Sequence, residues 1–233
     1  MPRGDFTAGG QMGLLDDLKR QADMVRTHDS LQRSNLQENT RVVDEAMHRA
    51  FLYLLELFKQ LEVLKPTNPT TYEIEGVGVL KDLRYVSGFV DPRKRKFADR
   101  DVYDYMDFYV KWAAPNNLVV ERDMPNTIKK VRDMLWASNI KAAEVESKTS
   151  YGSLGKVKFT IPVAITVNFT LKADIEGRRL LFYGKNALRL APDDFVVPAD
   201  ELTDELLEEL AKLLIGQQRG SSFLRYRAAL PRT

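Results

Sequence analysis

The sequence contains no cysteine, and this absence removes several classes of protein from consideration. Without a thiol, the chain cannot form a disulfide scaffold, a thiolate zinc site, an iron–sulfur cluster or a cysteine nucleophile. Its 233 residues are nevertheless enough to bury a hydrophobic core without such cross-links. The proportions of hydrophobic residues, 44%, and charged residues, 29%, are ordinary for a globular protein, which excludes the disordered and fibrous classes.

The chain also has little net charge and no long hydrophobic run. Lys and Arg number 35 against 33 Asp and Glu, so the whole molecule has no strong attraction to nucleic acid or anionic lipid. The most apolar stretch, residues 50–58, is interrupted by Glu56 and is shorter than the about 20 apolar residues that a membrane-spanning helix needs. We therefore expect no membrane insertion. Because no basic and apolar signal opens the sequence, we expect a cytoplasmic protein.

Residues that usually carry catalysis are scarce. The chain has two histidines, His28 and His48, and neither has a second ligand at metal-binding spacing. Glycine-rich phosphate loops of the known patterns are absent. A cluster of aspartates within residues 99–107 does not match a calcium-binding loop, and neighbouring basic residues balance its charge. We therefore predict no catalytic residue, no metal site and no cofactor, and favour a non-catalytic role while leaving an enzyme open.

The strongest periodic signal is helical. A first short amphipathic helix is predicted at residues 14–27, with Thr27, Asp29 and Ser30 as stop and cap signals. A longer helix is predicted at residues 36–65, and it should end before Pro66. Apolar residues on this second helix alternate at spacings of four and three, which is a heptad seam. The seam consists of Val43, Met47, Ala50, Leu54, Leu57, Leu61 and Leu64. A second apolar row contains Ala46, Phe51, Leu55 and Phe58.

After Pro66 the hydrophobic period changes from helical to alternating. Strands are predicted at residues 72–80, 84–91 and 102–112, with a charged loop at residues 92–100. The clearest alternation runs from Val157 to Ile175, where every odd residue is apolar, which is typical of one antiparallel strand with a buried and a wet face. Pro162 within this run should sit at an edge or a bend. Helices are predicted near residues 123–138 and 200–215, the latter capped by Asp200 or Thr203 and ended by Gly216.

These patterns predict an α+β fold, with an N-terminal helical hairpin containing a long amphipathic helix, followed by a mainly antiparallel sheet with two further helices. Residues 1–13 are interpreted as a flexible tail or tag-like segment, and residues 14–66 as a helical oligomerisation segment. Residues 71–216 form the predicted sheet domain, and residues 217–233 a basic C-terminal tail.

Two functional hypotheses follow from the sequence. In the first, the chain is a non-catalytic interaction protein that self-associates, or docks a protein partner, through the seam of the helix at residues 36–65. We expect a homo-oligomer here because closed dimers are the commonest assemblies. In the second, the sheet binds an anionic ligand or nucleic acid through a basic run and a row of tyrosines. The residues of this second site are Arg93, Lys94, Arg95, Lys96, Arg100, Tyr103, Tyr105 and Tyr109.

Overall fold

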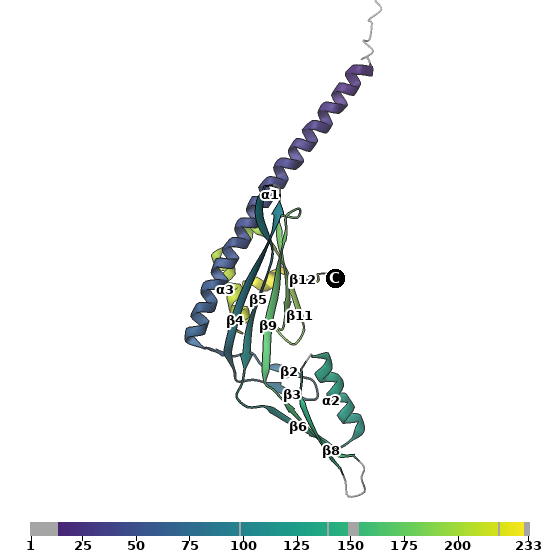
Figure 1. The fold of residues 1–233 in the computed structure, drawn as a ribbon, viewed down its shortest axis with the longest axis vertical. Helices are drawn as coiled ribbons and strands as arrows, with labels where there is room; N and C mark the ends of the chain where they lie inside the picture. Colours follow the sequence, from purple (N-terminus) through teal and green to yellow (C-terminus); the bar gives the residue numbers. More distant parts are fainter. Residues whose placement is uncertain (1–13, 98, 139, 149–153, 219, 231–233) are drawn as a thin grey trace, which may run out of the picture.

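The computed structural model describes residues 14–97, 99–138, 140–148, 154–218 and 220–230. It has an α+β fold in which a long N-terminal helix lies against a large antiparallel sheet and continues beyond it (Figure 1). The predicted fold class is confirmed, including the two further helices. The helices are α1 (Leu14–Leu64), α2 (Pro125–Ala137) and α3 (Asp204–Leu214), with short 3-10 turns η1 (Ala199–Glu201) and η2 (Ser222–Tyr226).

Helix α1 is a single continuous helix, and the predicted hairpin turn near residues 27–30 does not exist. Thr27 does not cap a new helix, because its hydroxyl donates to the carbonyl of Asp23 one turn earlier, at 2.8 Å. An ion pair between Arg26 and Asp23 also bridges one turn of the same segment. The helix ends at Leu64, before Pro66, as predicted.

Within the described residues, the main sheet has seven strands, all paired antiparallel, in the order β1-β4-β5-β9-β10-β11-β12. Its strands are β1 (Thr67–Asn68), β4 (Leu83–Phe97), β5 (Arg100–Ala113), β9 (Ala164–Asp174), β10 (Arg179–Lys185), β11 (Pro192–Pro198) and β12 (Arg227–Ala228). Strands β4 and β5 form one long hairpin, so the region predicted as a loop at residues 92–100 consists mostly of paired strand.

A smaller layer lies at the end of the main sheet away from the start of α1 (Figure 1). In the described part of the chain it contains a three-stranded sheet in the order β6-β8-β7. Its strands are β6 (Leu118–Arg122), β7 (Ala143–Lys148) and β8 (Leu154–Ile161). Helix α2 contributes Ile128, Val131 and Leu135 to the core. The predicted single strand at residues 72–80 is instead a hairpin of β2 (Tyr72–Ile74) and β3 (Gly78–Leu80), because Gly76 turns the chain with φ of 68°.

The alternating run from Val157 to Ile175 has the predicted burial but is divided between two sheets. Its odd residues are buried apart from Ala173, which is half-buried, and its even residues are exposed or half-exposed. The run breaks at Pro162 and Val163, where β8 leaves the small sheet and β9 enters the main one. Pro162 therefore lies at a bend, as its missing N–H requires. The carbonyl of Val163 accepts from the N–H of Ala114 at 2.8 Å, and this bond joins the two sheets.

One face of the main sheet is covered by the C-terminal half of α1 and by α3, and the core lies beneath them. Along β5, Met106, Phe108, Val110 and Trp112 are buried on this covered face, whereas the residues between them are exposed or half-exposed on the open face. Thr203 caps α3 by accepting from the N–H of Leu206, and Gly216 follows its end, as predicted. Residues of α1 and of the sheet belong to one continuous core cluster.

Candidate functional site

The predicted interface seam of α1 packs mainly against the chain's own sheet. Val43, Met47, Ala50, Leu54 and Leu61 are at most 5% exposed. Leu57 is half-buried against the core, and Leu64 is exposed at the end of the helix. The buried seam residues fill the core of the monomer, so in this structure they present no surface to a second molecule.

The second apolar row is also largely covered. Phe51 lies near the ring of Tyr103 in β5, with ring centroids 6.4 Å apart. Phe58 packs so closely on Gly88 of β4 that a Cβ on that glycine would lie 2.8 Å from the Phe58 ring. Ala46 is buried, and Leu55 remains 37% exposed. The sheet therefore covers both rows in the C-terminal half of α1, apart from their outer margin.

The N-terminal half of α1 is different, because it extends beyond the sheet (Figure 1). Every residue from 14 to 38 is exposed except Asp17, which is half-exposed. We call these residues the projecting segment. Its larger apolar side chains include Leu14, Leu18, Val25 and Leu36, which are 77%, 51%, 59% and 36% exposed. We call these four residues the projecting row.

The projecting row points in the same direction as the buried seam. Five turns of an α-helix take 18 residues, so residues 18 apart share one direction. Leu18, Leu36 and Leu54 are related by this interval. Val25, Val43 and Leu61 are related in the same way. The face of α1 that binds the sheet therefore continues into solvent, where no part of the described chain covers it.

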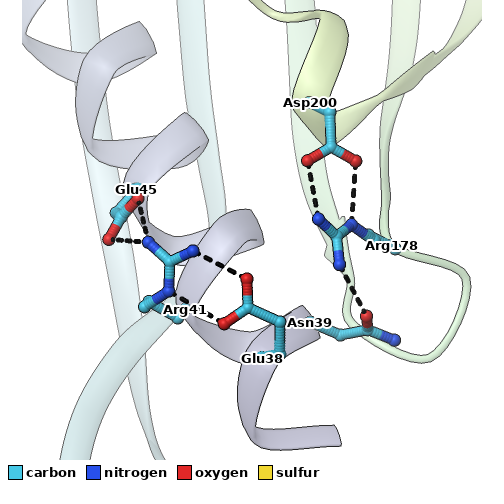
Figure 2. A network of polar contacts seen from close by, with 6 residues as sticks. All are labelled: Glu38, Asn39, Arg41, Glu45, Arg178 and Asp200. Atoms are coloured by element: carbon cyan, nitrogen blue, oxygen red, sulfur yellow. Dashed lines mark hydrogen bonds and ion pairs between the residues drawn. The ribbon is translucent and has the colours of Figure 1, made fainter. Parts of the chain in front are cut away.

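The point at which α1 leaves the sheet is held by polar contacts (Figure 2). Arg178, in the turn between β9 and β10, donates two hydrogen bonds of 2.8 Å to Asp200. The same guanidinium donates to the side-chain oxygen of Asn39 at 3.5 Å. We call Asn39, Arg178 and Asp200 the exit clamp. The next residue, Thr40, is the first buried residue of the helix.

A second polar cluster lies on the exposed side of α1 where its buried part begins. Arg41 donates to Glu38 at 2.7 and 3.0 Å and to Glu45 at 2.8 and 2.9 Å (Figure 2). The hydrogen bond from Arg41 lowers the pKa of Glu38, and the bond from Arg178 lowers the pKa of Asp200. Both carboxylates are therefore stabilised in their charged forms at neutral pH.

The predicted basic run lies on the β4–β5 hairpin, and several of its charges have partners within the hairpin. Arg93 pairs with Asp91 at 2.6 Å, and Arg95 pairs with Asp104 at 3.2 Å. The ammonium of Lys94 lies 4.5 Å from the centre of the Tyr103 ring. Lys96 and Arg100 are exposed near the tip of the hairpin, where Lys96 lies opposite Asp101. The run is thus interleaved with acids rather than being a continuous positive surface.

The three predicted tyrosines do not share one face. The pairing of β4 and β5 shifts between Arg93 and Lys94, and Asp104 is the extra residue that forms a bulge. Beyond this bulge Tyr103 is buried against α1, where its backbone N–H donates to Asp44 at 2.7 Å. Tyr105 and Tyr109 are half-exposed, and Tyr109 stacks on Phe89 with centroids 5.6 Å apart. The structure therefore separates Tyr103 from the other two.

The histidines have ordinary polar contacts. Nε2 of His28 lies 2.9 Å from the side-chain nitrogen of Gln32 on the projecting segment, and Nδ1 of His48 lies 3.0 Å from the hydroxyl of Tyr103. No cluster of three or more His, Asp or Glu side chains arranged to hold a metal ion occurs among the described residues. Nor does the described chain include a helix that is both long and apolar enough to cross a bilayer.

The exit clamp was not predicted from the sequence. Asn39 and Arg178 are 139 residues apart, so no local spacing relates them. The only local sign was the Glu176-Gly177 turn, which places the hairpin but not its contact with α1. Comparison with known proteins adds no further assignment, because no protein family, curated protein or solved structure matches this chain.

Proposed function

We propose that this chain is a non-catalytic interaction protein that self-associates through α1, using the projecting segment rather than the buried seam. The observation that supports the proposal is the continuity of one apolar face along the helix. The same face that is buried at Val43 and Leu54 is solvent-exposed at Leu18 and Val25.

Burial of the projecting row by a second helix is energetically favourable. Most helical stability in proteins comes from packing of an apolar face rather than from intrinsic propensity, so a projecting helix is stabilised when its apolar row is covered. Each large apolar side chain that becomes fully buried contributes about 1.5–3 kcal/mol. Leu18, Val25 and Leu36 would contribute in this way if a second helix lay on them. Asp29 and Gln32 interrupt the row, so we expect a short and weak contact.

A second copy of the chain is the partner that we propose. The projecting segment carries four basic residues, Lys19, Arg20, Arg26 and Arg33. It carries five acidic residues, Asp16, Asp17, Asp23, Asp29 and Glu38. This near balance means that two copies do not repel each other overall, and symmetric pairs are the commonest assemblies.

The position of the sheet favours an antiparallel pair. The projecting row faces the same side as the sheet, so a parallel partner would continue into the space that the sheet occupies. An antiparallel partner carries its own sheet at the opposite end and avoids this clash. In a pair centred near Thr27, Leu18 of one chain meets Leu36 of the other. The flank that carries Lys19, Arg26 and Arg33 then faces the same flank of the other chain, with Lys19 near Arg33 and Arg26 near its own copy. Salt screens the repulsion between these basic residues.

Sedimentation velocity of the full chain tests the proposal. We expect a monomer–dimer equilibrium in the micromolar range that becomes tighter as salt is raised. Hydrophobic contact survives salt, and the repulsion between like-charged flanks is screened. A monomer at every concentration and salt level would refute self-association.

Binding of an anionic ligand or nucleic acid by the open face of the sheet is a second proposal. The specific observation that favours it is the half-exposed stack of Tyr109 on Phe89, with Tyr105 on the same strand. Aromatic rings on an open sheet can stack bases. Fluorescence titration with a single-stranded RNA oligonucleotide tests it. Binding that falls with salt and is lost in Tyr109→Ala supports it, and binding unaffected by that substitution contradicts it.

A further inference from the structure

An open cavity of about 480 Å³ lies at the edge of the main sheet, beside the turn between β9 and β10. Val196 of β11 forms part of its floor, and it faces opposite to the buried neighbours Phe195 and Val197. The walls come from the turn before β10 and its first residue, from the end of η2 and from β12. β12 pairs with Asp194 and Phe195, so the cavity lies at the edge of the sheet, beside Val196 and Pro198 of β11.

The walls of this cavity are rich in arginine. Among the described residues, its lining includes Arg178, Arg179, Arg225 and Arg227, and it includes no Asp or Glu. These arginines come from two segments about 50 residues apart in the sequence, and the fold brings them around one space. Arg225 and Arg227 belong to the predicted basic C-terminal tail, and no local spacing relates that tail to the turn before β10.

Carboxylates outside the lining hold the first two guanidiniums in place. Asp200 accepts two hydrogen bonds from Arg178, each of 2.8 Å. Asp174 accepts from Nε of Arg179 at 2.6 Å. Such pairing restricts each side chain before any ligand arrives, so less conformational entropy is lost on binding.

The other two arginines are held in a similar way. Arg227 pairs with Asp193 at 3.2 Å, and Asp193 is fully buried and also accepts from the N–H of Leu188 at 3.0 Å. The guanidinium of Arg225 lies 4.6 Å from the centre of the Tyr226 ring. It also lies 3.6 Å from Glu201. Tyr226 lines the cavity as well and gives it an aromatic wall.

The carboxylate contacts leave some guanidinium donors free to bind a ligand. A guanidinium has five N–H groups, and one carboxylate occupies only some of them. The four partner carboxylates balance the four positive charges, so attraction of an anion depends on directed donors rather than on a large net charge. Guanidinium groups match the geometry of phosphate, with two parallel hydrogen bonds to one phosphate group.

We propose that this cavity binds a small organic phosphate, with Arg179 and Arg225 on the phosphate and Val196 and Tyr226 beside the organic part. The volume is within the about 300–1,000 Å³ that is usual for small-molecule sites and exceeds the need of a single phosphate ion. The proposal is independent of self-association, because it uses no residue of the projecting segment.

Isothermal titration of the full chain with adenosine 5′-diphosphate tests the proposal, with citrate as the carboxylate comparison. We expect the nucleotide to bind and citrate to bind more weakly. The double variant R179Q/R225Q should weaken nucleotide binding by at least about tenfold for each arginine lost, because hydrogen bonds to charged groups are the stronger ones. The variant R179K/R225K keeps the charge but removes the guanidinium geometry, and it should also weaken binding.

The matched control is R20Q/R132Q, which also removes two exposed arginines that pair with carboxylates, but on α1 and α2. It should bind the nucleotide as the unchanged chain does. Thermal unfolding shows whether each variant is folded. If R179Q/R225Q does not fold, nucleotide binding by R179K/R225K decides the outcome. Three results would overturn the proposal: no nucleotide binding, tighter binding of citrate, or equal loss of nucleotide binding in R20Q/R132Q.

Discussion

The hydroxyl of Tyr103 lies 3.0 Å from Nδ1 of His48, and this contact joins β5 to α1 inside the folded chain. The backbone N–H of Tyr103 also donates to Asp44 of the same helix. Burial raises the pKa of the Tyr103 hydroxyl, and the charge of Asp44 raises it further. Tyr103 therefore attaches the helix to the sheet, and it differs in this from the half-exposed Tyr105 two residues later.

Replacing Tyr103 by Phe should destabilise the chain, because it removes the hydrogen bond to His48. The buried ring itself is kept. We expect a loss of about 0.5–1.5 kcal/mol in the free energy of unfolding. Tyr105→Phe is the matched control and should change the unfolding free energy little. Urea unfolding followed by circular dichroism measures both. Equal effects of the two substitutions would contradict the separation of these tyrosines by the bulge at Asp104.

Leu54 and Leu52 lie on opposite sides of α1 and should respond differently to truncation. Leu54 is fully buried against the sheet, whereas Leu52 is 51% exposed. Leu54→Ala should lower the free energy of unfolding by about 2–5 kcal/mol, because it leaves a cavity in the core. Leu52→Ala should stay within about 0.5 kcal/mol. A small effect at Leu54, measured by urea unfolding, would show that the seam is not part of the core of the monomer.

The alternation across β9 can be tested with one charge on each face. Ile165→Asp places an unpaired carboxylate in the core and should unfold the chain or reduce its stability severely. Asn168→Asp places the same group on the exposed face and should leave the melting temperature nearly unchanged. Thermal unfolding compares the two. If Asn168→Asp were the more damaging change, the assignment of the two faces would be reversed.

The exit clamp and the neighbouring Glu38–Arg41 pair should weaken in acid. Hydrogen bonds from Arg41 and Arg178 lower the pKa values of Glu38 and Asp200 from their ordinary values of 4.5 and 3.8. A carboxyl with a lowered pKa stabilises the folded form at neutral pH, and this contribution is lost as the pH falls through the lowered value. We expect a spin label on Gln37→Cys to become more mobile below the ordinary carboxylate range.

Because the chain has no native cysteine, this label is attached at a single position. Arg178→Gln should give the same increase in mobility at neutral pH. Arg132→Gln is the control, since it removes an ion pair with Glu144 far from the clamp in the fold. A label whose mobility is the same with and without Arg178 would show that the clamp does not hold the helix.

The sequence predicted features that depend on local periodicity. The alternation from Val157 to Ile175 identified the buried faces, because side chains in a strand alternate whatever its partners are. The end of α1 before Pro66 followed from the backbone of proline itself. Pro162 was expected at an edge or a bend of one long strand. At this bend the chain passes from one sheet to the other, because β8 pairs with β6 and β9 pairs with β5. The local alternation carries no information about these partner strands.

Features that depend on distant partners were missed or wrong. Thr27 and Ser30 resemble helix caps, but a helix accepts both residues, and the structure continues through them. The bulge at Asp104 arises from the cross-strand register of β4 and β5, so alternation alone placed Tyr103 on the wrong face. The exit clamp and the arginine-lined cavity each join residues from separated segments. Composition revealed their charges but not their proximity.

Sedimentation velocity on two double variants tests self-association through the projecting row most directly. L18E/V25E places charges on the row, and M24E/L31E places the same charges on two equally exposed apolar residues on another side of the helix. Because none of the four residues is buried, both variants should keep the melting temperature of the unchanged chain. We predict that L18E/V25E is monomeric at concentrations where the unchanged chain and M24E/L31E are dimeric. Dimers that persist in L18E/V25E, or that are lost equally in both variants, would contradict the account.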